Sequence, residues 1–239
     1  MGRSLAVIPA FNENDSIADV VAAVRDELPS WDVVVIDDGS DDLTSQSARE
    51  AGADVVKTPF NLGIGGAVQT GFVLAWEGGY ERMVQVDGDG QHEAHEVPKL
   101  EMTMDASGVD MVCGSRFLGE GNRYPAPISR RTGIHIFAFL LSWLLRQRIS
   151  DPTSGFRLYN RKAIELFASD YPHDYPEVET VLMLHRHRLK MMEVPVDMRL
   201  RNGGQSSISS GKSAYYMVKV MLALFVGLLR RPAPATKGE

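Results

Sequence analysis

Short apolar runs rich in β-branched residues alternate along this chain with longer segments of helical spacing. This alternation is typical of an α/β fold in which helices cover both faces of a mainly parallel sheet. At 239 residues the chain is long enough to bury the core of one such domain. The expected strands are residues 5–9, 33–37, 53–57, 83–87 and 111–114.

The first expected helix is the best defined by its residues. Ser16 and Asp19 resemble a capping box, and apolar residues then recur at helical spacing until Pro29. We interpret this apolar face as core: Ile17, Val20, Val21, Val24 and Leu28. Two further helices are expected, one from residues 41–43 to Gly52 and one from Gly66 to Gly78.

Polar loops follow three of the expected strands. In parallel sheets, ligands bind beyond the carboxyl ends of the strands, so we expect these loops to form one site. A carboxylate after the second strand could accept the ring N–H of a nucleobase or hold ribose hydroxyls, and the first loop could form the opposite wall. The loops are residues 9–13, 37–41 and 87–92.

A glycine-rich segment, residues 61–67, opens the third expected helix, where its backbone could approach a nucleotide closely. Gly63 and Gly65 fit the start of the dinucleotide fingerprint G-x-G-x-x-G/A, but Val68 occupies the last position. The sequence contains no P-loop motif either. An NAD enzyme and a P-loop nucleotidase are therefore poorly supported.

Two carboxylates, Asp87 and Asp89, close the fourth expected strand and are separated only by Gly88. Alternate residues of an extended chain point the same way, so both side chains can bind one hard cation such as Mg²⁺ or Mn²⁺. Gln91 and His92 offer further polar groups in the same turn. The alternative is an acidic turn that binds no metal.

Composition narrows the partners and the compartment. A formal net charge of −6 argues against nucleic acid as a partner. The single cysteine, Cys113, excludes an intramolecular disulfide, and Pro9 and Asn12 interrupt the first apolar stretch too early for a signal peptide. We therefore expect a cytoplasmic chain.

Two later segments, residues 134–145 and 214–229, are more apolar than a water-soluble domain needs. Both are shorter than the roughly 20 residues that cross a bilayer. Flanking basic residues favour helices that lie in the membrane interface, although an ordinary buried helix stays open as the alternative. We expect an α/β domain over residues 1–210, an apolar helix over 211–231 and a disordered tail over 232–239.

Six sequence blocks occur in a fixed order along the chain. They are VIPAFNE at 7–13, VIDDGSDD at 35–42, NLGIGGA at 61–67, DGDGQH at 87–92, GSRF at 114–117 and SGFRLY at 154–159. Together they resemble the family 2 glycosyltransferases, and within them the polyprenyl (dolichyl) phosphate sugar synthases. The resemblance implies a GT-A fold. It also implies that the chain transfers a sugar from a nucleoside diphosphate sugar of the GDP-mannose or UDP-glucose type. The transfer would invert the anomeric configuration and use a divalent metal.

The resemblance also implies roles for individual residues. The nucleoside pocket would be lined by Pro9, Phe11, Glu13, Ile36 and Asp38. The diphosphate would face Asp87, Gly88 and Asp89, and the metal would be held by Asp87, Asp89 and Gln91. Arg116 and Arg201 would lie where the family keeps arginines near phosphates. A lysine that follows the second arginine in the dolichyl enzymes is replaced here by Ser206 or Ser207, which leaves the sugar open.

The expected chemistry follows from the charges. Negative charge grows on the leaving diphosphate, where the metal, Arg116 and Arg201 would stabilise it. A phosphate monoester, with a second pKa of about 6, is already largely ionised and can attack without a general base. Arg130 and Arg131 precede the first apolar segment, where they would either bind the acceptor phosphate or only anchor the helix.

We therefore expect a peripheral transferase at the inner face of the cell membrane that acts on a polyprenyl phosphate. A separate membrane protein is a further expected partner, because chains with these blocks often continue into transmembrane helices. Two alternatives stay open. A transferase that extends a saccharide or another soluble acceptor would use Glu177 or Glu179 as its base, and a catalytically silent subunit would only bind the nucleotide sugar.

Overall fold

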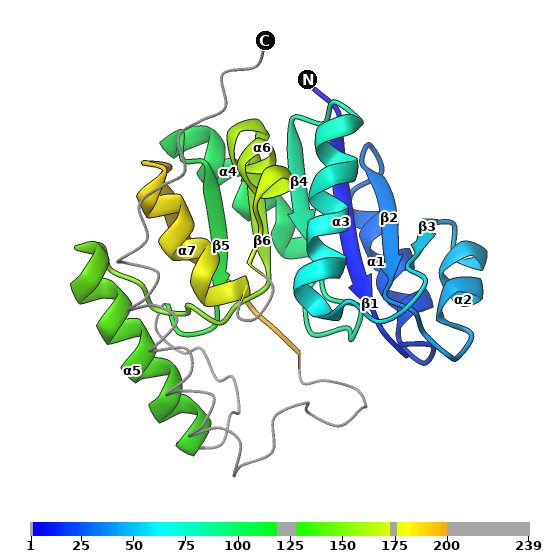
Figure 1. Ribbon diagram of the computed structural model, residues 1–239, viewed down its shortest axis with the longest axis horizontal. Coiled ribbons are helices and arrows are strands. Elements are labelled where there is room, and N and C mark those ends of the chain that lie inside the picture. Colours follow the sequence, from blue (N-terminus) through cyan, green and yellow to red (C-terminus); the bar gives the residue numbers. More distant parts are fainter. Residues whose placement is uncertain (1, 119–127, 173–175, 200–239) are drawn as a thin grey trace.

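The computed structural model describes residues 2–118, 128–172 and 176–199. The strands are β1 (Ser4–Ala10), β2 (Asp32–Asp37), β3 (Asp54–Lys57), β4 (Arg82–Gln85), β5 (Met111–Ser115), β6 (Arg157–Asn160) and β7 (Met191–Pro195). They form one seven-stranded sheet in the order β3-β2-β1-β4-β6-β5-β7 (Figure 1). Among these strands β6 runs antiparallel to both of its neighbours, and the other pairs are parallel.

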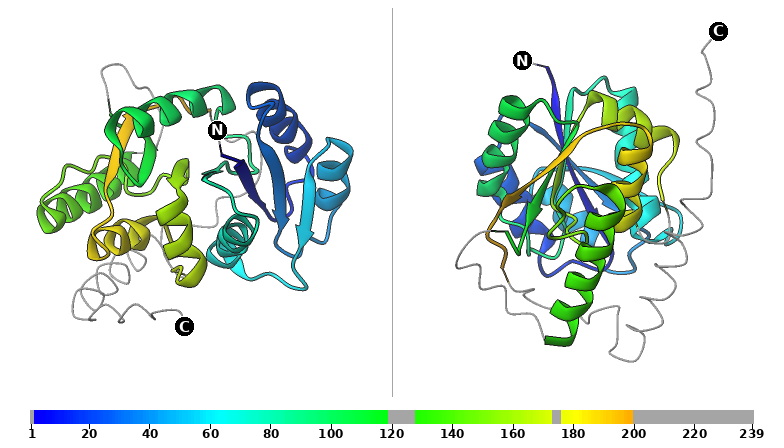
Figure 2. Two further views of the ribbon diagram at one scale, coloured as in Figure 1. Left: turned by 90° about the horizontal axis from the view of Figure 1, so that it is seen from above. Right: turned by 90° about the vertical axis from the view of Figure 1, so that its left-hand side faces the viewer.

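Helices cover both faces of the sheet (Figure 2). They are α1 (Ile17–Glu27), α2 (Thr44–Glu50), α3 (Gly63–Glu77), α4 (Val97–Ser107), α5 (Ile128–Leu145), α6 (Arg161–Ser169) and α7 (Pro176–Arg186), with a short 3-10 helix at Ala94–Glu96. On one face α3, α5, α6 and α7 pack on a core that includes Phe72 and Phe167. On the other face α1, α2 and α4 pack on a second core that includes Val21 and Leu100.

The mainly parallel sheet predicted from the alternation of elements is confirmed. All five predicted strands are present with ends shifted by one or two residues, so Asp87 follows β4 and does not lie in it. The sequence pattern does not predict β6 and β7. β6 is four residues long and starts with the buried Arg157, and β7 carries Glu193 at its centre, so neither shows the apolar run of a parallel strand.

The start of α1 differs from the predicted capping box. The Ser16 hydroxyl makes no hydrogen bond to a backbone N–H of the first turn. It donates instead to the carbonyl oxygen of Gly88 at 2.7 Å. The capping box is therefore wrong, and Ser16 joins the first helix to the acidic turn after β4.

The first apolar segment forms α5, which buries some of its apolar side chains and exposes others. Phe137 and Leu141 are buried in the core, whereas Ile136, Phe139 and Trp143 are 44%, 71% and 75% exposed. In the part of the chain that the structure describes, no helix has the length and apolar character to cross a membrane. The second apolar segment and the expected tail lie outside the described residues.

Candidate active site

The carboxyl ends of β1, β2 and β4 bring the three polar loops together. Ala10 and Asp37 are paired at the ends of β1 and β2, and the Asp38 N–H donates to the Ala10 carbonyl at 2.9 Å. The Gly88 N–H donates to the carbonyl of Pro9 at 3.3 Å. The loops therefore form one continuous edge, as expected from the topology of a parallel sheet.

Asp38 links the second loop to the start of α3. Its carboxylate accepts hydrogen bonds from the backbone N–H groups of Leu62 and Gly63, both at 2.8 Å. Gly39, with a φ of +76°, lets the loops approach, because a Cβ there would lie 2.8 Å from the carbonyl carbon of Phe60. Each carboxylate oxygen has two lone pairs, so Asp38 is held in place and can still accept a bond from a ligand.

Asp37, beside it, is fully buried. Burial alone would raise the pKa of this carboxyl group, but hydrogen bonds from Ser40 and Ser45 and the ammonium group of Lys57 outweigh burial and hold that pKa below its ordinary value. The Lys57 ammonium lies 3.7 Å from Asp37. Asp37 is therefore an ionised anchor for the second loop, a role that the motif alone does not reveal.

The first loop presents one predicted pocket residue to the surface. Phe11 is 43% exposed, whereas Pro9 and Ile36 are buried and face each other in the paired strands. The Glu13 N–H donates to the hydroxyl of Thr44 at 2.9 Å, which ties this loop to α2. Of the predicted pocket residues in this part of the site, Phe11 has the aromatic face that is accessible for stacking on a base.

The acidic turn is organised by His92. The backbone N–H of Asp87 donates to His92 Nδ1 at 2.9 Å. A backbone N–H can only donate, so Nδ1 is the acceptor of this bond. Nε2 lies 3.6 Å from the carboxylate of Asp87, and the ring packs on Phe156 with centroids 4.9 Å apart. His92 thus packs between the acidic turn and Phe156 and holds the turn in place.

The Asp87 carboxylate lies in a space that glycine keeps open. A Cβ on Gly155 would lie 3.2 Å from both carboxylate oxygens of Asp87. Gln85 donates to one of these oxygens at 3.2 Å, and the Gln91 N–H donates to Asp89 at 3.0 Å. The side-chain oxygens of Asp87, Asp89 and Gln91 are the donor type that Mg²⁺ and Mn²⁺ prefer, so the chemistry of these residues suits such an ion. Among the described residues, no group of three or more His, Cys, Asp and Glu side chains is arranged to hold a metal.

Arg116 is buried against a carboxylate that the sequence motifs do not reveal. Its Nε and Nη2 donate to the two oxygens of Asp151 at 2.7 and 2.8 Å, and Nη2 also donates to Thr153 at 2.7 Å. Asp151 is fully buried. The predicted phosphate-binding arginine is therefore a paired charge at the end of β5.

The C-terminal part of the described chain returns to the acidic turn. The Arg199 N–H donates to the carbonyl of Gln91 at 3.0 Å, and Met198 pairs with His92. Arg201, Ser206 and Ser207 follow outside the described residues. Arg130 and Arg131 lie in the first turn of α5, where the structure describes the backbone only.

A second buried arginine holds the loop behind Asp87. Arg157 donates to the carbonyls of Ser154 and Glu177 at 2.7 and 2.6 Å, and also to the Thr180 hydroxyl. It thereby joins the loop before β6 to the first turn of α7. Burial raises the pKa of the Glu177 carboxyl group, and the nearby charge of Asp87 adds to this effect.

Several known proteins are similar to this chain in sequence. The family model described as "Glycosyl transferase family 2" matches residues 5–167. An undecaprenyl-phosphate mannosyltransferase of Micrococcus luteus is 30% identical over 225 residues, which cover 87% of this chain and 88% of that protein. A polyprenol monophosphomannose synthase of Mycolicibacterium smegmatis is 30% identical over 227 residues, which cover 91% of this chain and 85% of that protein.

Solved structures share the architecture. Glucosyl-3-phosphoglycerate synthase from Mycobacterium tuberculosis, in complex with Mn²⁺, UDP and glucosyl-3-phosphoglycerate, has a TM-score of 0.71 to this chain at 19% identity. The match covers 98% of this chain and 82% of that chain, and it concerns the fold alone. Because the family model spans more than half of the chain and the relatives most of it, this chain belongs to glycosyl transferase family 2 and is a glycosyltransferase with the GT-A fold.

Proposed function

We propose that this chain transfers a sugar, with inversion, from a nucleoside diphosphate sugar to a polyprenyl phosphate at a membrane surface. The observation that carries the proposal is the position of α5. His135, in the first half of this helix, packs on Phe117 just beyond β5, with ring centroids 5.6 Å apart. The same helix exposes Ile136, Phe139 and Trp143. An apolar surface therefore adjoins the carboxyl edge, where a lipid-linked acceptor needs it.

The donor would bind across the three loops as a nucleoside diphosphate sugar of the GDP-mannose or UDP-glucose type. Phe11 would stack on the base, and Asp38, already oriented by the start of α3, would accept a ring N–H. The remaining walls would be formed by Pro9, Glu13, Ile36 and the backbone at Gly65. The acidic turn, including Gly88, would face the diphosphate.

Asp87, Asp89 and Gln91 would hold a divalent cation, Mg²⁺ or Mn²⁺. When bound, such an ion supplies positive charge that offsets the negative charge growing on the leaving diphosphate. Gln85, which donates to the Asp87 carboxylate, and His92, which lies beside it, would help to orient this group toward the ion. The Mn²⁺ complex of the structural neighbour supports this inference.

The chain's arginines would act on the phosphates from two sides. Arg201 would contact the diphosphate directly, and Arg116, oriented at the end of β5 by its pair with Asp151, would lie near the phosphates. Arg130 and Arg131, at the start of α5, would orient the acceptor phosphate, which is already ionised and needs no base. The surface would be the inner face of the cell membrane, with a separate membrane protein as a further partner.

A transfer assay tests the proposal. Purified protein is incubated with Mn²⁺, labelled nucleotide sugars and detergent-dispersed polyprenyl phosphate, and the lipid fraction is analysed. We expect a sugar phosphate lipid whose anomeric configuration, determined by NMR, is opposite to that of the donor. Transfer to free sugars but not to the lipid would overturn the acceptor assignment, and binding of donor with no turnover would identify a silent subunit.

A second acceptor class is favoured by one observation. Glu177 lies close enough to Asp87 to feel its charge, and burial raises the pKa of its carboxyl group, which makes it a better base for a hydroxyl acceptor. We expect Glu177→Gln to leave transfer to polyprenyl phosphate largely unchanged. A loss of more than about 100-fold that is confined to hydroxyl acceptors would identify Glu177 as the base for such an acceptor.

A further inference from the structure

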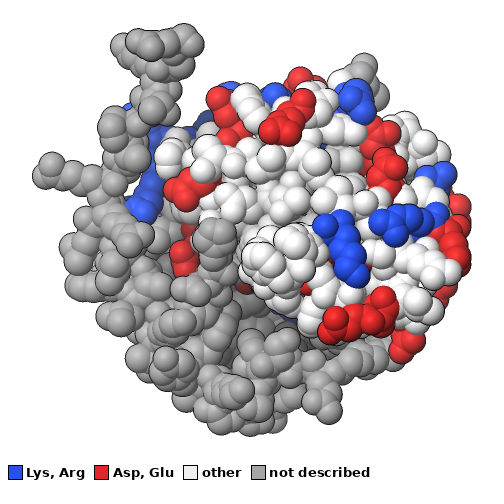
Figure 3. Space-filling view, turned by 45° about the vertical axis from the view of Figure 1, so that its right-hand side comes forward, with Lys and Arg blue, Asp and Glu red and all other residues white. Residues whose placement is uncertain are grey.

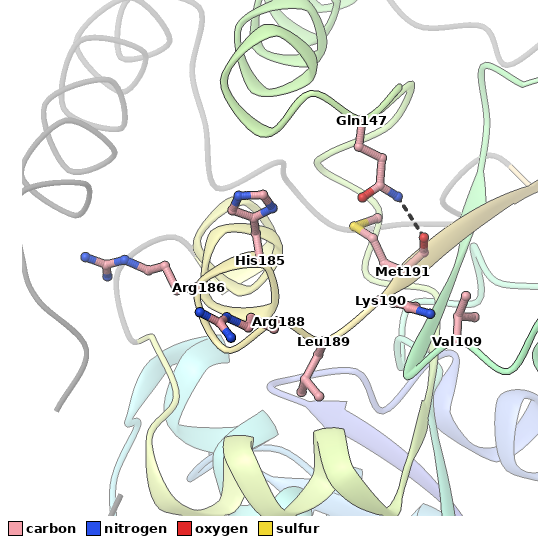
Figure 4. Close-up of a pocket in the computed structure, with 8 residues that line it drawn as sticks. All are labelled: Val109, Gln147, His185, Arg186, Arg188, Leu189, Lys190 and Met191. Carbon is pink, nitrogen blue, oxygen red and sulfur yellow. Dashed lines mark hydrogen bonds between the residues drawn. The ribbon is translucent and has the colours of Figure 1, made fainter. Parts of the chain in front are cut away.

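A pocket of about 690 Å³ lies between the last turn of α7 and the start of β7. It is far from the donor loops, which are the three polar loops at residues 9–13, 37–41 and 87–92. It is at the amino ends of β5 and β7, so the strands separate it from the carboxyl edge. His185 and Arg188 lie on one wall, and Gln147 and Lys190 on the other (Figure 4). The Gln147 amide donates to the carbonyl of Met191 at 2.7 Å, which fixes that wall.

The charged side chains of this lining are all basic. Arg188 and Lys190 are exposed and form no ion pair with any residue that the structure describes. Asp110 is buried beneath the wall, where its carboxylate accepts the backbone N–H of Lys190 at 2.7 Å. On the face shown in Figure 3, by contrast, acidic and basic side chains are interspersed. In a chain of net charge −6, this concentration of positive charge fits an anionic ligand.

The pocket adjoins the end of α5. Arg146 and Arg148 flank Gln147 in the sequence, and the exposed Trp143 stands four residues before Gln147. Ser142 accepts the N–H of Ile149 at 2.9 Å, so the chain that leaves α5 is tied back to the helix. Because His135, in the first half of α5, contacts Phe117 near the carboxyl ends of the strands, and Gln147 after the helix lines the pocket, α5 extends from that edge toward the pocket.

We propose that the pocket binds the phosphate group of an anionic membrane lipid. The proposal rests on the proposed function at a membrane surface, and it adds a second lipid contact at the far end of α5 from the donor loops. Guanidinium and ammonium groups supply the charge and the N–H donors that a phosphate needs. The lipid is the source, because Gln147 of the pocket wall follows directly on α5, a helix that exposes Trp143 and is followed by Arg146 and Arg148. Aromatic and basic residues near each other are typical of the headgroup region of a membrane.

Vesicle binding tests this site without using enzymatic turnover. Cosedimentation compares vesicles of phosphatidylcholine alone with vesicles that also contain phosphatidylglycerol. The pocket variant is Arg188→Gln/Lys190→Gln. The matched control is Arg25→Gln/Arg49→Gln, which removes the same charge from exposed residues on α1 and α2, toward the other edge of the sheet. Thermal unfolding confirms that all proteins are folded.

We expect the native chain to prefer the anionic vesicles, and the pocket variant to bind them about 30-fold more weakly, since each basic residue at such a surface contributes about fivefold. The control should retain most of the preference. Equal losses in both variants would assign the effect to overall charge and overturn the site. A different outcome would assign a soluble ligand and overturn the lipid assignment. In that outcome the native chain shows no preference for anionic vesicles, and glycerol phosphate raises the melting temperature of the native and control proteins but not of the pocket variant. Because transfer to detergent-dispersed lipid is assayed separately, failure here leaves the proposed function standing.

Discussion

Arg116 takes its environment from a partner far along the chain. Asp151 stands 35 residues later, yet its fully buried carboxylate accepts bonds from the Arg116 backbone and guanidinium. Breaking a buried pair leaves one charge without compensation, which costs much more than the pair itself contributes. The position of this arginine therefore depends on a residue that lies outside its own motif.

Replacing Asp151 tests this dependence. Asp151→Asn keeps the shape of the side chain but removes the charge opposite a buried guanidinium, so we expect the free energy of unfolding to fall by about 3–5 kcal/mol. Denaturant titration measures the change. The control is Asp105→Asn, which removes an exposed partner of Arg82 and should cost less than about 1 kcal/mol. Equal losses in the two variants would contradict the role assigned to burial.

The elements differ in how far the sequence predicts them. α1 and the strands around the donor loops follow their apolar patterns, and the three loops follow from strand ends. β6 and β7 do not, because their positions depend on pairing with β4 and β5 and on polar contacts of Arg157 and Glu193. α5 shows apolar residues all round in sequence, so only packing decides which face is buried.

The first turn of α7 gives a pH prediction. The pKa of Glu177 is raised above its ordinary value of 4.5, so between that value and its folded pKa the native state binds more protons than the unfolded state. The contribution of Glu177 to stability is therefore present at lower pH and is lost as pH rises through this window. We expect Glu177→Gln to remove this part of the pH dependence in urea titrations. A pH dependence unchanged by Glu177→Gln would contradict this assignment.

The exposed face of α5 gives a prediction on membrane binding. Phe139→Ser/Trp143→Ser removes two large apolar side chains that make little contact with the core, so stability should stay close to native. Binding to phosphatidylcholine vesicles should weaken more than about tenfold, since each side chain loses apolar area that the interface would bury. Met102→Ser, on the exposed face of α4, is the control. Unchanged binding of the double variant would remove α5 from the membrane surface.

The whole molecule distributes its proposed functions around one sheet. The donor loops lie at the carboxyl ends of β1, β2 and β4, and α5 extends from the end of β5 toward the amino end of β7. The proposed donor site and the proposed lipid contact therefore lie on separate elements. Their effects can be measured independently in one folded chain.

Removal of divalent metal tests the proposed donor site. We expect chelator-treated protein to lose sugar transfer by at least about 100-fold, because the leaving diphosphate then lacks its main positive partner. Mn²⁺ should restore the rate in the native chain but not in Asp87→Asn/Asp89→Asn. Circular dichroism checks that the fold persists throughout. Full activity after chelation would contradict the metal site.

The sequence by itself determined the class of fold, the place of the donor loops and the family, because these depend on local periodicity, strand ends and short motifs. Tertiary structure alone decided how the site is supported. His92 orients Asp87, Asp151 pairs with Arg116, and Gly155 leaves room behind the acidic turn. These contacts join residues whose spacing carries no periodic signal, so only the packing of the completed sheet brings them together.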